Sequence, residues 1–417
     1  MKRTLVISNA CFSDEGSNGR TLKSLFRGTD KDKLAQFFVY GKPDFGVCKK
    51  YYRVGDKEAL KSIFPFVKMN GVVEEKAMKD QGTNEVPQSV EKLVHKTPLK
   101  VLMREIIWKL ARWDKESFWK WLDDFAPQVI CLFIASNTFL IRLAIRVAKK
   151  YNIPVIVYST EGYSFMDYNY FTNRPSVAYR LYYAWLCREY KKVAAYTKCG
   201  FFNSTLLRDK YQSEYGYPCK CLMNSSEIEF LAHPQVDSER RMTISYLGNL
   251  GLGRYKALIE VAQVLQEIDN QLYLEVYGAA PSEEANNELT KCPGIRFHGF
   301  VPYDEVVRVI HNSGLLIHAE LNDAIVNRDL KFAFSTKIAD CICSGTPLLL
   351  YANETLAETV FLKENECAFI AHDRAGLKEV LEQALTDEEQ RKKVIDNAKI
   401  AKEKFLTGNS ALIQMLS

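Results

Sequence analysis

The sequence predicts an α/β protein of two domains, each built on a doubly wound parallel sheet. Its 417 residues exceed what one hydrophobic core usually holds. An apolar run, a glycine-bearing turn and an amphipathic helix follow one another near residue 4 and again near residue 243. That order opens a sheet whose strands are connected by helices. We place the domains at 1–235 and 236–405, with residues 406–417 as a tail.

Composition restricts the class of protein. Hydrophobic residues make up 47% and charged residues 26% of the chain, as in globular proteins, and no apolar run could span a membrane. The start MKRTLVISNA runs directly into a strand, so we expect no signal peptide. The 11 cysteines show no metal-binding or disulfide spacing, which indicates a reducing cytoplasm. The net charge of +5 suits anionic substrates or an anionic membrane face and gives no reason to expect nucleic acid.

The first domain opens with a buried strand at residues 4–8. A loop with Gly16, Asn18 and Gly19 follows, and Arg20 opens an amphipathic helix. The loop lacks the G-x-G-x-x-G order of nicotinamide sites. It is either a place where a ligand approaches backbone N–H groups or an ordinary turn, and the residues leave both open.

Strands and helices alternate through the rest of this domain. We expect strands at 34–40, 127–134, 154–158 and 201–204, and helices at 99–125, 139–151 and 176–198. The segment 127–158 is one β-α-β unit, whose crossover should be right-handed. Residues 67–97 are polar and predict a long loop, and residues 218–238 predict the linker.

The expected helix at 99–125 has a basic side as well as an apolar one. Ile106, Leu110, Trp113 and Trp121 are among its apolar positions. We interpret it as a core-packed helix with a solvated basic face. The alternative is a peripheral contact with anionic lipid, because tryptophan and lysine together suit a membrane interface.

Glu161 follows the expected strand at 154–158. Ligands of open parallel sheets bind beyond the carboxyl ends of the strands, so we expect this carboxylate at the edge of the sheet where a ligand binds. There it can accept a hydrogen bond from an acceptor hydroxyl and take its proton late in a reaction. The alternative is a loop carboxylate exposed to water, and Asp167 is a second candidate.

The second domain opens with a strand at 243–247, a turn that begins at Gly248 and Asn249, and a helix. Arg254 and Lys256 lie at the start of that helix. A cation there opposes the helix dipole, which favours a role in binding an anion over a purely structural one. Further strands are expected at 272–277 and 315–318, and residues 320–333 are expected to form a loop.

Residues 334–350, FSTKIADCICSGTPLLL, predict a capped helix, a glycine turn and a buried strand. Ser335 and Thr336 can cap the helix, whose N-terminus favours anions. Lys337 and Asp340 lie one turn apart, which suits a diphosphate joined to a ribose. A capped helix with a surface Lys–Asp pair is the structural alternative.

This block resembles the donor-binding block P-S-K-x-x-E-Y-x-x-x-G-x-P of retaining family 4 glycosyltransferases of the GT-B fold (glycosyl transferases group 1). The matching positions are Ser335, Lys337, Asp340, Gly345 and Pro347. Asp340 replaces the usual Glu, and Phe332 stands where many relatives have the first Glu of an E-x7-E pair.

The resemblance implies two Rossmann-like domains facing a central cleft, an acceptor-binding one followed by a nucleotide-sugar-binding one. It implies that Arg254 and Lys337 contact the donor diphosphate and stabilise the charge that grows as the glycosidic bond breaks. It also puts Phe297 and His298 beside the base, although the residues favour a structural histidine over a ligand contact at His298. Glu320 is a candidate for the donor hydroxyls.

We therefore expect a retaining hexosyltransferase-like enzyme that takes a nucleotide sugar and a glycan or polyprenyl-linked acceptor. An inverting enzyme commonly needs a histidine base from the acceptor side, and none is well placed, because the one histidine of the first half, His95, lies in the polar segment 67–97. No D-x-D motif lies in a suitable loop, so we expect no metal and no cofactor. A role in surface polysaccharide biosynthesis, in the cytoplasm and with a possible peripheral contact at the inner membrane face, is implied by the resemblance only. The alternatives are a nucleotide-sugar epimerase and, because of Phe332, a non-catalytic sugar-binding subunit.

Overall fold

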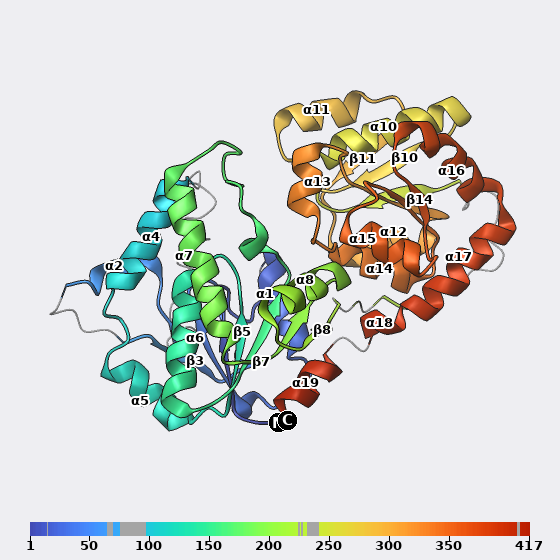
Figure 1. Ribbon diagram of the computed structural model, residues 1–417. Helices are drawn as coiled ribbons and strands as arrows, with labels where there is room; N and C mark the ends of the chain where they lie inside the picture. Colours follow the sequence, from blue (N-terminus) through green and yellow to red (C-terminus); the bar gives the residue numbers. More distant parts are fainter. Residues whose placement is uncertain are drawn as a thin grey trace. The chain divides into compact units, whose positions relative to one another are not determined.

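The computed structural model of the chain describes residues 1–14, 16–64, 70–75, 97–223, 226, 228–231, 242–406 and 409–417 (Figure 1). The chain divides into two compact units, Met1–Leu222 with Asn409–Ser417 (unit 1) and Met223–Gly408 (unit 2). The expected boundary between residues 235 and 236 lies outside the described residues. Residues 409–417, expected in a separate tail, group with unit 1.

Within the described residues, unit 1 is built on an eight-stranded sheet of order β4-β3-β2-β1-β5-β6-β7-β8. Its strands are β1 (Thr4–Ile7), β2 (Leu34–Phe38), β3 (Lys50–Arg53), β4 (Val72–Val73), β5 (Val129–Phe133), β6 (Val155–Ser159), β7 (Thr197–Phe202) and β8 (Cys219–Cys221). Each recorded pairing is parallel except that of β3 with the edge strand β4. Central strands such as β1 are wholly buried, because helices cover both faces of a parallel sheet.

The helices of unit 1 lie on the two faces of this sheet (Figure 1). They are α1 (Gly16–Leu25), α2 (Asp56–Lys61), α4 (Pro98–Leu110), α5 (Glu116–Phe125), α6 (Thr138–Tyr151), α7 (Val177–Ala194), α8 (Thr205–Tyr215) and α19 (Ser410–Leu416). The terminal helix α19 belongs to this unit because Leu412 and Leu416 are buried in its core. The Leu416 carbonyl also accepts a hydrogen bond from the Lys2 N–H, at 2.7 Å.

The structure corrects several expectations about the elements of unit 1. The single helix expected at 99–125 is two helices, because the chain turns after Leu110 and packs the Trp113 indole against Phe37 and Phe118, with ring centroids 5.0 and 5.1 Å away. Residues 201–204 are not the last strand of this half, since β8 follows within the expected linker. The expected loop at 67–97 falls almost wholly outside the described residues, which include β4 within it.

Unit 2, over its described residues, is built on a six-stranded sheet of order β11-β10-β9-β12-β13-β14, in which each recorded pairing is parallel. Its strands are β9 (Ile244–Leu247), β10 (Leu274–Tyr277), β11 (Ile295–Gly299), β12 (Leu315–Ala319), β13 (Leu348–Tyr351) and β14 (Phe369–Ala371). Its helices are α10 (Arg254–Ile268), α11 (Glu283–Lys291), α12 (Tyr303–Asn312), α13 (Ala324–Leu330), α14 (Thr336–Ser344), α15 (Ala357–Glu364), α16 (Arg374–Thr386), α17 (Glu388–Ala401) and α18 (Glu403–Leu406). The expected loop at 320–333 therefore contains a helix, which begins where Asp323 accepts hydrogen bonds from two backbone N–H groups.

Two glycines bring the carboxyl ends of β9 and β10 unusually close together. A Cβ atom on Gly278 would lie 2.1 Å from the carbonyl oxygen of Gly248. No side chain larger than hydrogen fits there without moving backbone, because real Cβ atoms do not approach an oxygen so closely. The turn that follows β9 therefore depends on Gly278 as well as on its own glycines.

We predict that Gly278→Ala destabilises unit 2 by about 1–3 kcal/mol, the usual cost of overpacking a tight site. Far-UV circular dichroism during urea unfolding measures the loss. Gly376→Ala is the control, since its nearest neighbour is 3.7 Å from the added Cβ and the position is helical. That change should be neutral or slightly stabilising. Equal destabilisation by both changes would contradict the close approach.

Candidate functional site

Two helix N-termini meet the same edge of the unit 2 sheet. The strand β9 precedes α10, and β12 precedes α14 with α13 between them; β9 and β12 are neighbours. Because both strands are parallel, their carboxyl ends lie at one edge, where ligands of such sheets bind. The first N–H groups of a helix have no partner within it and favour anions. Ser335 takes up one of them, since its hydroxyl accepts from the Lys337 N–H at 3.3 Å.

Arg254, the first residue of α10, forms a bidentate ion pair with Glu320 just after β12. Its Nε lies 2.8 and 2.9 Å from the two carboxylate oxygens, and its Nη2 lies 2.6 Å from Oε1. Glu320 is only 2% exposed. Burial alone would lower the pKa of Arg254, but the Glu320 charge outweighs it and raises that pKa. Glu320 therefore holds Arg254 in place, and its expected contact with a donor hydroxyl stays a prediction.

His318 and Glu358 extend this pair to the second helix. His318 Nε2 lies 3.4 Å from Glu320 and 3.5 Å from Glu358. Glu358 Oε2 in turn accepts a hydrogen bond from the Ser335 N–H at 3.4 Å. A continuous chain of contacts therefore joins Arg254 at the start of α10 to Ser335 at the start of α14.

The network is charge-balanced. Burial would lower the pKa of His318, but Glu358 and Glu320 outweigh it and raise that pKa to about 9. Two carboxylates thus face one guanidinium and one imidazolium. The ligand atoms of His318, Glu320 and Glu358 lie within 4.8 Å of one another, close enough to surround a metal ion. We interpret the cluster as an ion-pair network, because Arg254 already occupies both oxygens of Glu320.

Lys337 and Asp340 are one turn apart on α14, as expected. Their charged atoms are 3.8 Å apart, and Asp340 also accepts a hydrogen bond from the Ser226 hydroxyl at 2.8 Å. Burial raises the pKa of Asp340, with Lys337 and Ser226 acting against it. Asp340 is only 9% exposed, and its expected contact with a ribose stays a prediction. Thr336 lies exposed at the helix start.

The other expected donor contacts lie apart from this network. Asn249 is exposed, and its side-chain oxygen accepts from the Gly251 N–H at 2.8 Å. The Lys256 ammonium lies over the Tyr255 ring at 5.7 Å. Phe297 packs against the core on the edge strand β11, and the neighbouring His298 has two partners of its own.

His298 has the structural role that the sequence left open. Its Nε2 lies 2.5 Å from Glu275, and its ring stacks on Tyr277 with centroids 4.4 Å apart. Contact with a base stays a prediction for both Phe297 and His298.

The expected loop of unit 1 is the first turn of a helix. Because α1 begins at Gly16, the residues Asn18, Gly19 and Arg20 are helical, and the helix does not start at Arg20. A Cβ on Gly19 would lie 3.0 Å from Ser13, so this glycine allows a close approach of the preceding chain. Asn18 and Arg20 are exposed.

Glu161 lies directly beyond β6, as expected. Its backbone carbonyl accepts from Ser159 and Tyr211 at 2.9 and 3.3 Å. The side chain retains some exposure but is surrounded by protein, and desolvation raises its pKa to about 7. A carboxylate with such a pKa is suited to take a proton near neutral pH. Asp167 is exposed.

Comparisons with known proteins agree with this architecture. Residues 232–401 match the family described as Glycosyl transferases group 1. The fold is GT-B. HepE from Anabaena, solved in complex with UDP, superposes with a TM-score of 0.63 and 11% identity over 100% of this chain and 99% of that one. WaaG, a glycosyltransferase involved in lipopolysaccharide biosynthesis, gives 0.55 and 12% over 99% of both chains.

Sucrose-phosphate synthase from Thermosynechococcus elongatus is similar too, with a TM-score of 0.60 and 10% identity over 99% of this chain and 96% of that one. No curated protein sequence matches the chain. The sequence predicted a GT-B fold with two Rossmann-like domains, and this prediction is confirmed. Among the described residues of this GT-B chain, no helix is both long and apolar enough to cross a membrane.

Sequence reasoning missed His318 and gave Glu358 no role at the site. A weak signal was available, because His318 and Glu320 are two residues apart at a strand end and so share a face. Glu358 lies 38 positions beyond Glu320, and nothing local in the sequence relates the two residues.

We predict that the stability of unit 2 depends on pH through the protonation of His318. The folded pKa of about 9 exceeds the unfolded value of about 6.5, so the native state holds the proton more tightly. Its contribution, at most about 3 kcal/mol, is fully present below pH ~6.5 and is lost as pH rises through ~9. His318→Gln should abolish this loss.

Hydrogen exchange of the α14 amides, corrected for the intrinsic effect of pH, measures this dependence. Fluorescence reports only on unit 1, since all 5 tryptophans lie between residues 108 and 185. His372→Gln, which removes a histidine of the same unit outside the network, is the control. An unchanged slope between pH 6.5 and 9 in His318→Gln would show that the proton resides elsewhere.

Proposed function

We propose that the protein transfers a sugar from a nucleotide-sugar donor to a glycan or polyprenyl-linked acceptor, with retention and without a metal. The observation that carries the proposal is the Arg254–Glu320–His318–Glu358 network, which joins two helix N-termini at the ligand-binding edge of unit 2. Those residues lie within the segment that matches the glycosyltransferase family. The sequence block around Lys337 supports the same interpretation.

The network suits a diphosphate. Arg254 uses Nε and Nη2 on Glu320, so its Nη1 hydrogens remain for an anion. Because Glu320 fixes the guanidinium, no reorganisation is needed when negative charge grows on the leaving group. Preorganised donors of this kind are worth about 3–4 kcal/mol each in a transition state. The exposed N-terminus of α14 and the Lys337 ammonium supply further positive potential.

The histidine content of unit 1, the proposed acceptor-binding half, supports retention of configuration at the transferred sugar. The described residues of unit 1 contain no histidine, and the only histidine of its sequence, His95, lies outside them. A front-face displacement needs no such base, because the departing phosphate takes the acceptor proton. In this scheme Glu161 accepts a hydrogen bond from the acceptor hydroxyl and orients it.

The biological setting follows by analogy. HepE was solved with UDP, and WaaG is involved in lipopolysaccharide biosynthesis. We propose a UDP-sugar or related donor and a role in surface polysaccharide assembly, in the cytoplasm at the membrane face. A second candidate, a non-catalytic donor-binding subunit, is favoured by Phe332, which leaves the position of the usual Glu without a carboxylate.

We predict that Arg254 is needed for turnover. Arg254→Gln alone leaves the buried Glu320 charge without its bidentate partner and with only the more distant His318, so the double variant Arg254→Gln/Glu320→Gln is the better test. Its kcat/KM should fall about 10²–10³-fold, as when one oxyanion donor is removed. Lys378→Gln, which removes an exposed cation of α16 in the same unit, should keep activity within about threefold. Turnover is measured as release of UDP, GDP, ADP or CMP from the matching sugar nucleotide, with the donor chosen by thermal shift.

The outcomes separate the candidates. Donor binding without turnover across acceptors would favour the non-catalytic subunit, whereas a new nucleotide sugar formed from donor alone would favour an epimerase. Loss of activity in chelator, restored by added metal, would contradict metal independence. Undiminished activity of the double variant would remove the basis of the donor site.

We also predict an acid limb in the pH profile that belongs to Glu161. This carboxyl has a pKa of about 7 and must be ionised to accept the hydrogen bond, so kcat/KM should decline as pH falls through about 7. Glu161→Gln should be slower and should lack this limb, whereas Asp167→Asn should retain it. An identical limb in Glu161→Gln would assign it to another group.

A further inference from the structure

Tyrosine is concentrated in one stretch of unit 1. Twelve of the 22 tyrosines lie between residues 158 and 217, which hold the end of β6 together with α7, β7 and α8. On α7 they recur at 179, 182, 183 and 190, a helical spacing that puts their side chains on one face. Tyr179, Tyr182 and Tyr190 are each at most 2% exposed, so a phenol hydroxyl at these positions needs a partner.

Two of these hydroxyls hold the loop beyond β5. Tyr182 donates to the Ser136 carbonyl at 2.6 Å, and Tyr190 donates to the Ala135 carbonyl at 3.1 Å. Loop carbonyls have no partner in a helix or a strand ladder, so they depend on donors of this kind or on water. The loop is therefore tied to α7 where the strand ends.

Three further hydroxyls hold the loop beyond β6, which carries Glu161. Because β5 and β6 are parallel neighbours, this loop lies at the same edge of the sheet as the first. The hydrogen bonds to its carbonyls are Tyr211 to Glu161 at 3.3 Å, Tyr183 to Ser164 at 2.9 Å and Tyr179 to Met166 at 2.5 Å. Phenol groups of α7 and α8 thus fix this loop at three points.

Tyr211 has a fixed ring as well as a fixed hydroxyl. It is fully buried, and its ring stacks on Phe202 with centroids 4.3 Å apart and meets Phe165 edge-on at 5.0 Å. Ser159 donates to the same Glu161 carbonyl at 2.9 Å. The Glu161 peptide group is therefore held by two elements, α8 and the end of β6.

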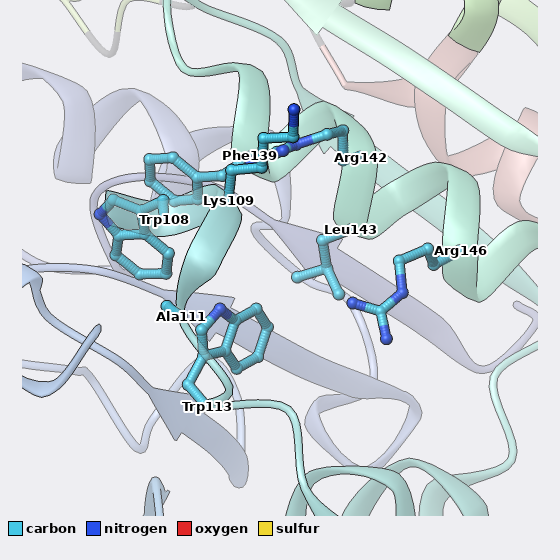
Figure 2. A pocket seen from close by; sticks show the side chains of 8 residues that line it. All are labelled: Trp108, Lys109, Ala111, Trp113, Phe139, Arg142, Leu143 and Arg146. Atoms are coloured by element: carbon cyan, nitrogen blue, oxygen red, sulfur yellow. The ribbon is translucent and has the colours of Figure 1, made fainter. Parts of the chain in front are cut away.

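Helix α7 is in turn anchored away from its tyrosines. Trp185 lies on a different side of the helix and has Lys109 of α4 and Arg142 of α6 over its ring, at 5.4 and 5.1 Å from the centroid. Both cations also line a pocket between those two helices (Figure 2). Because α4 and α6 hold α7 on this side, the tyrosine hydroxyls are presented from a fixed support.

The proton affinity of the Glu161 carboxyl depends on the packing around it. Desolvation raises its pKa to about 7. Tyr170 and Tyr211 face it, and burial, with a smaller contribution from the Glu161 charge, raises the pKa of each phenol to about 12. Both phenols are therefore neutral at the pH where Glu161 titrates. A looser loop would let water reach the carboxylate and would lower its pKa.

We propose that Tyr211 is a positioning residue, whose hydroxyl, together with those of α7, holds the Glu161 carboxylate where the acceptor hydroxyl binds. The proposal rests on the role proposed for Glu161 in sugar transfer. A carboxylate on a fixed peptide loses little further freedom when the acceptor arrives, so more of the binding free energy remains for the transition state. Phenols that only satisfied buried carbonyls would contribute stability without a selective effect on rate.

The test compares two conservative tyrosine variants. Tyr211→Phe keeps the buried ring and removes the hydroxyl, so kcat should fall about tenfold, the factor that one hydrogen bond commonly carries, with KM for the acceptor nearly unchanged. Tyr51→Phe is the control, because this buried tyrosine of β3 also donates to a loop carbonyl, that of Asp44, at 2.6 Å. It should keep kcat within about twofold, although circular dichroism should show a similar loss of Tm in both variants.

The Glu161→Gln background shows whether Tyr211 acts through Glu161. There Tyr211→Phe should lower kcat by less than about twofold more, because the effects of coupled residues are not additive. A tenfold loss in both backgrounds would overturn the proposal, as would equal losses of kcat in Tyr211→Phe and Tyr51→Phe.

A measurement without turnover separates this proposal from the proposed function. When the glutamate side-chain carboxyls are labelled with carbon-13, the NMR signal that is missing from Glu161→Gln reports the pKa of Glu161. That pKa should be about 7 in the native protein and should fall in Tyr211→Phe but not in Tyr51→Phe. An unchanged pKa in Tyr211→Phe would overturn the proposal. The expected fall without consumption of any nucleotide sugar would refute sugar transfer and would still support the hold of Tyr211 on Glu161.

Discussion

The candidate site of unit 2 depends on the buried ion pair between Arg254 and Glu320. Taking two charges out of water costs several kcal/mol per ion, and only close, bidentate contact repays that cost. The ion pair therefore says little about the stability of the protein. It says more about where the Arg254 guanidinium is held. It fixes a guanidinium at the N-terminus of α10, where the helix dipole would otherwise repel it. His318 and Glu358 carry the same constraint to α14.

The parallel sheet makes this arrangement possible. The adjacent strands β9 and β12 end at one edge of the sheet. Helix α10 follows β9 there, and α14, which follows β12 after α13, begins at the same edge. The close approach of Gly278 to Gly248 brings the β9 turn against β10, which leaves α10 to start directly beyond the strand ends. The side chains of the network therefore span only short distances to contact one another. Fold and site are linked through the ends of strands, not through their faces.

Local features of this site were predictable from the sequence, and long-range ones were not. Ser335 caps α14 and Gly345 ends it in the left-handed conformation, at φ 78°, because both roles depend on neighbours within one turn. The Lys337–Asp340 pair is equally local. The partners of Arg254 and Ser335 lie 66 and 23 positions away, so no periodicity reveals them. The break after Leu110 was missed for the same reason, since it depends on Phe37 receiving Trp113.

The two cationic sites of the chain differ in how their charge is balanced. Arg254 has its carboxylate without any ligand, so the position of its guanidinium is already set. Arg142 has an indole and a neighbouring lysine, and its Nε has no acceptor among the described residues. A compensated cation positions chemistry, because it does not move when charge develops. An uncompensated cation instead gains most of its free energy when an anion binds. By this physical criterion the network of unit 2 suits the catalytic role that we propose for it.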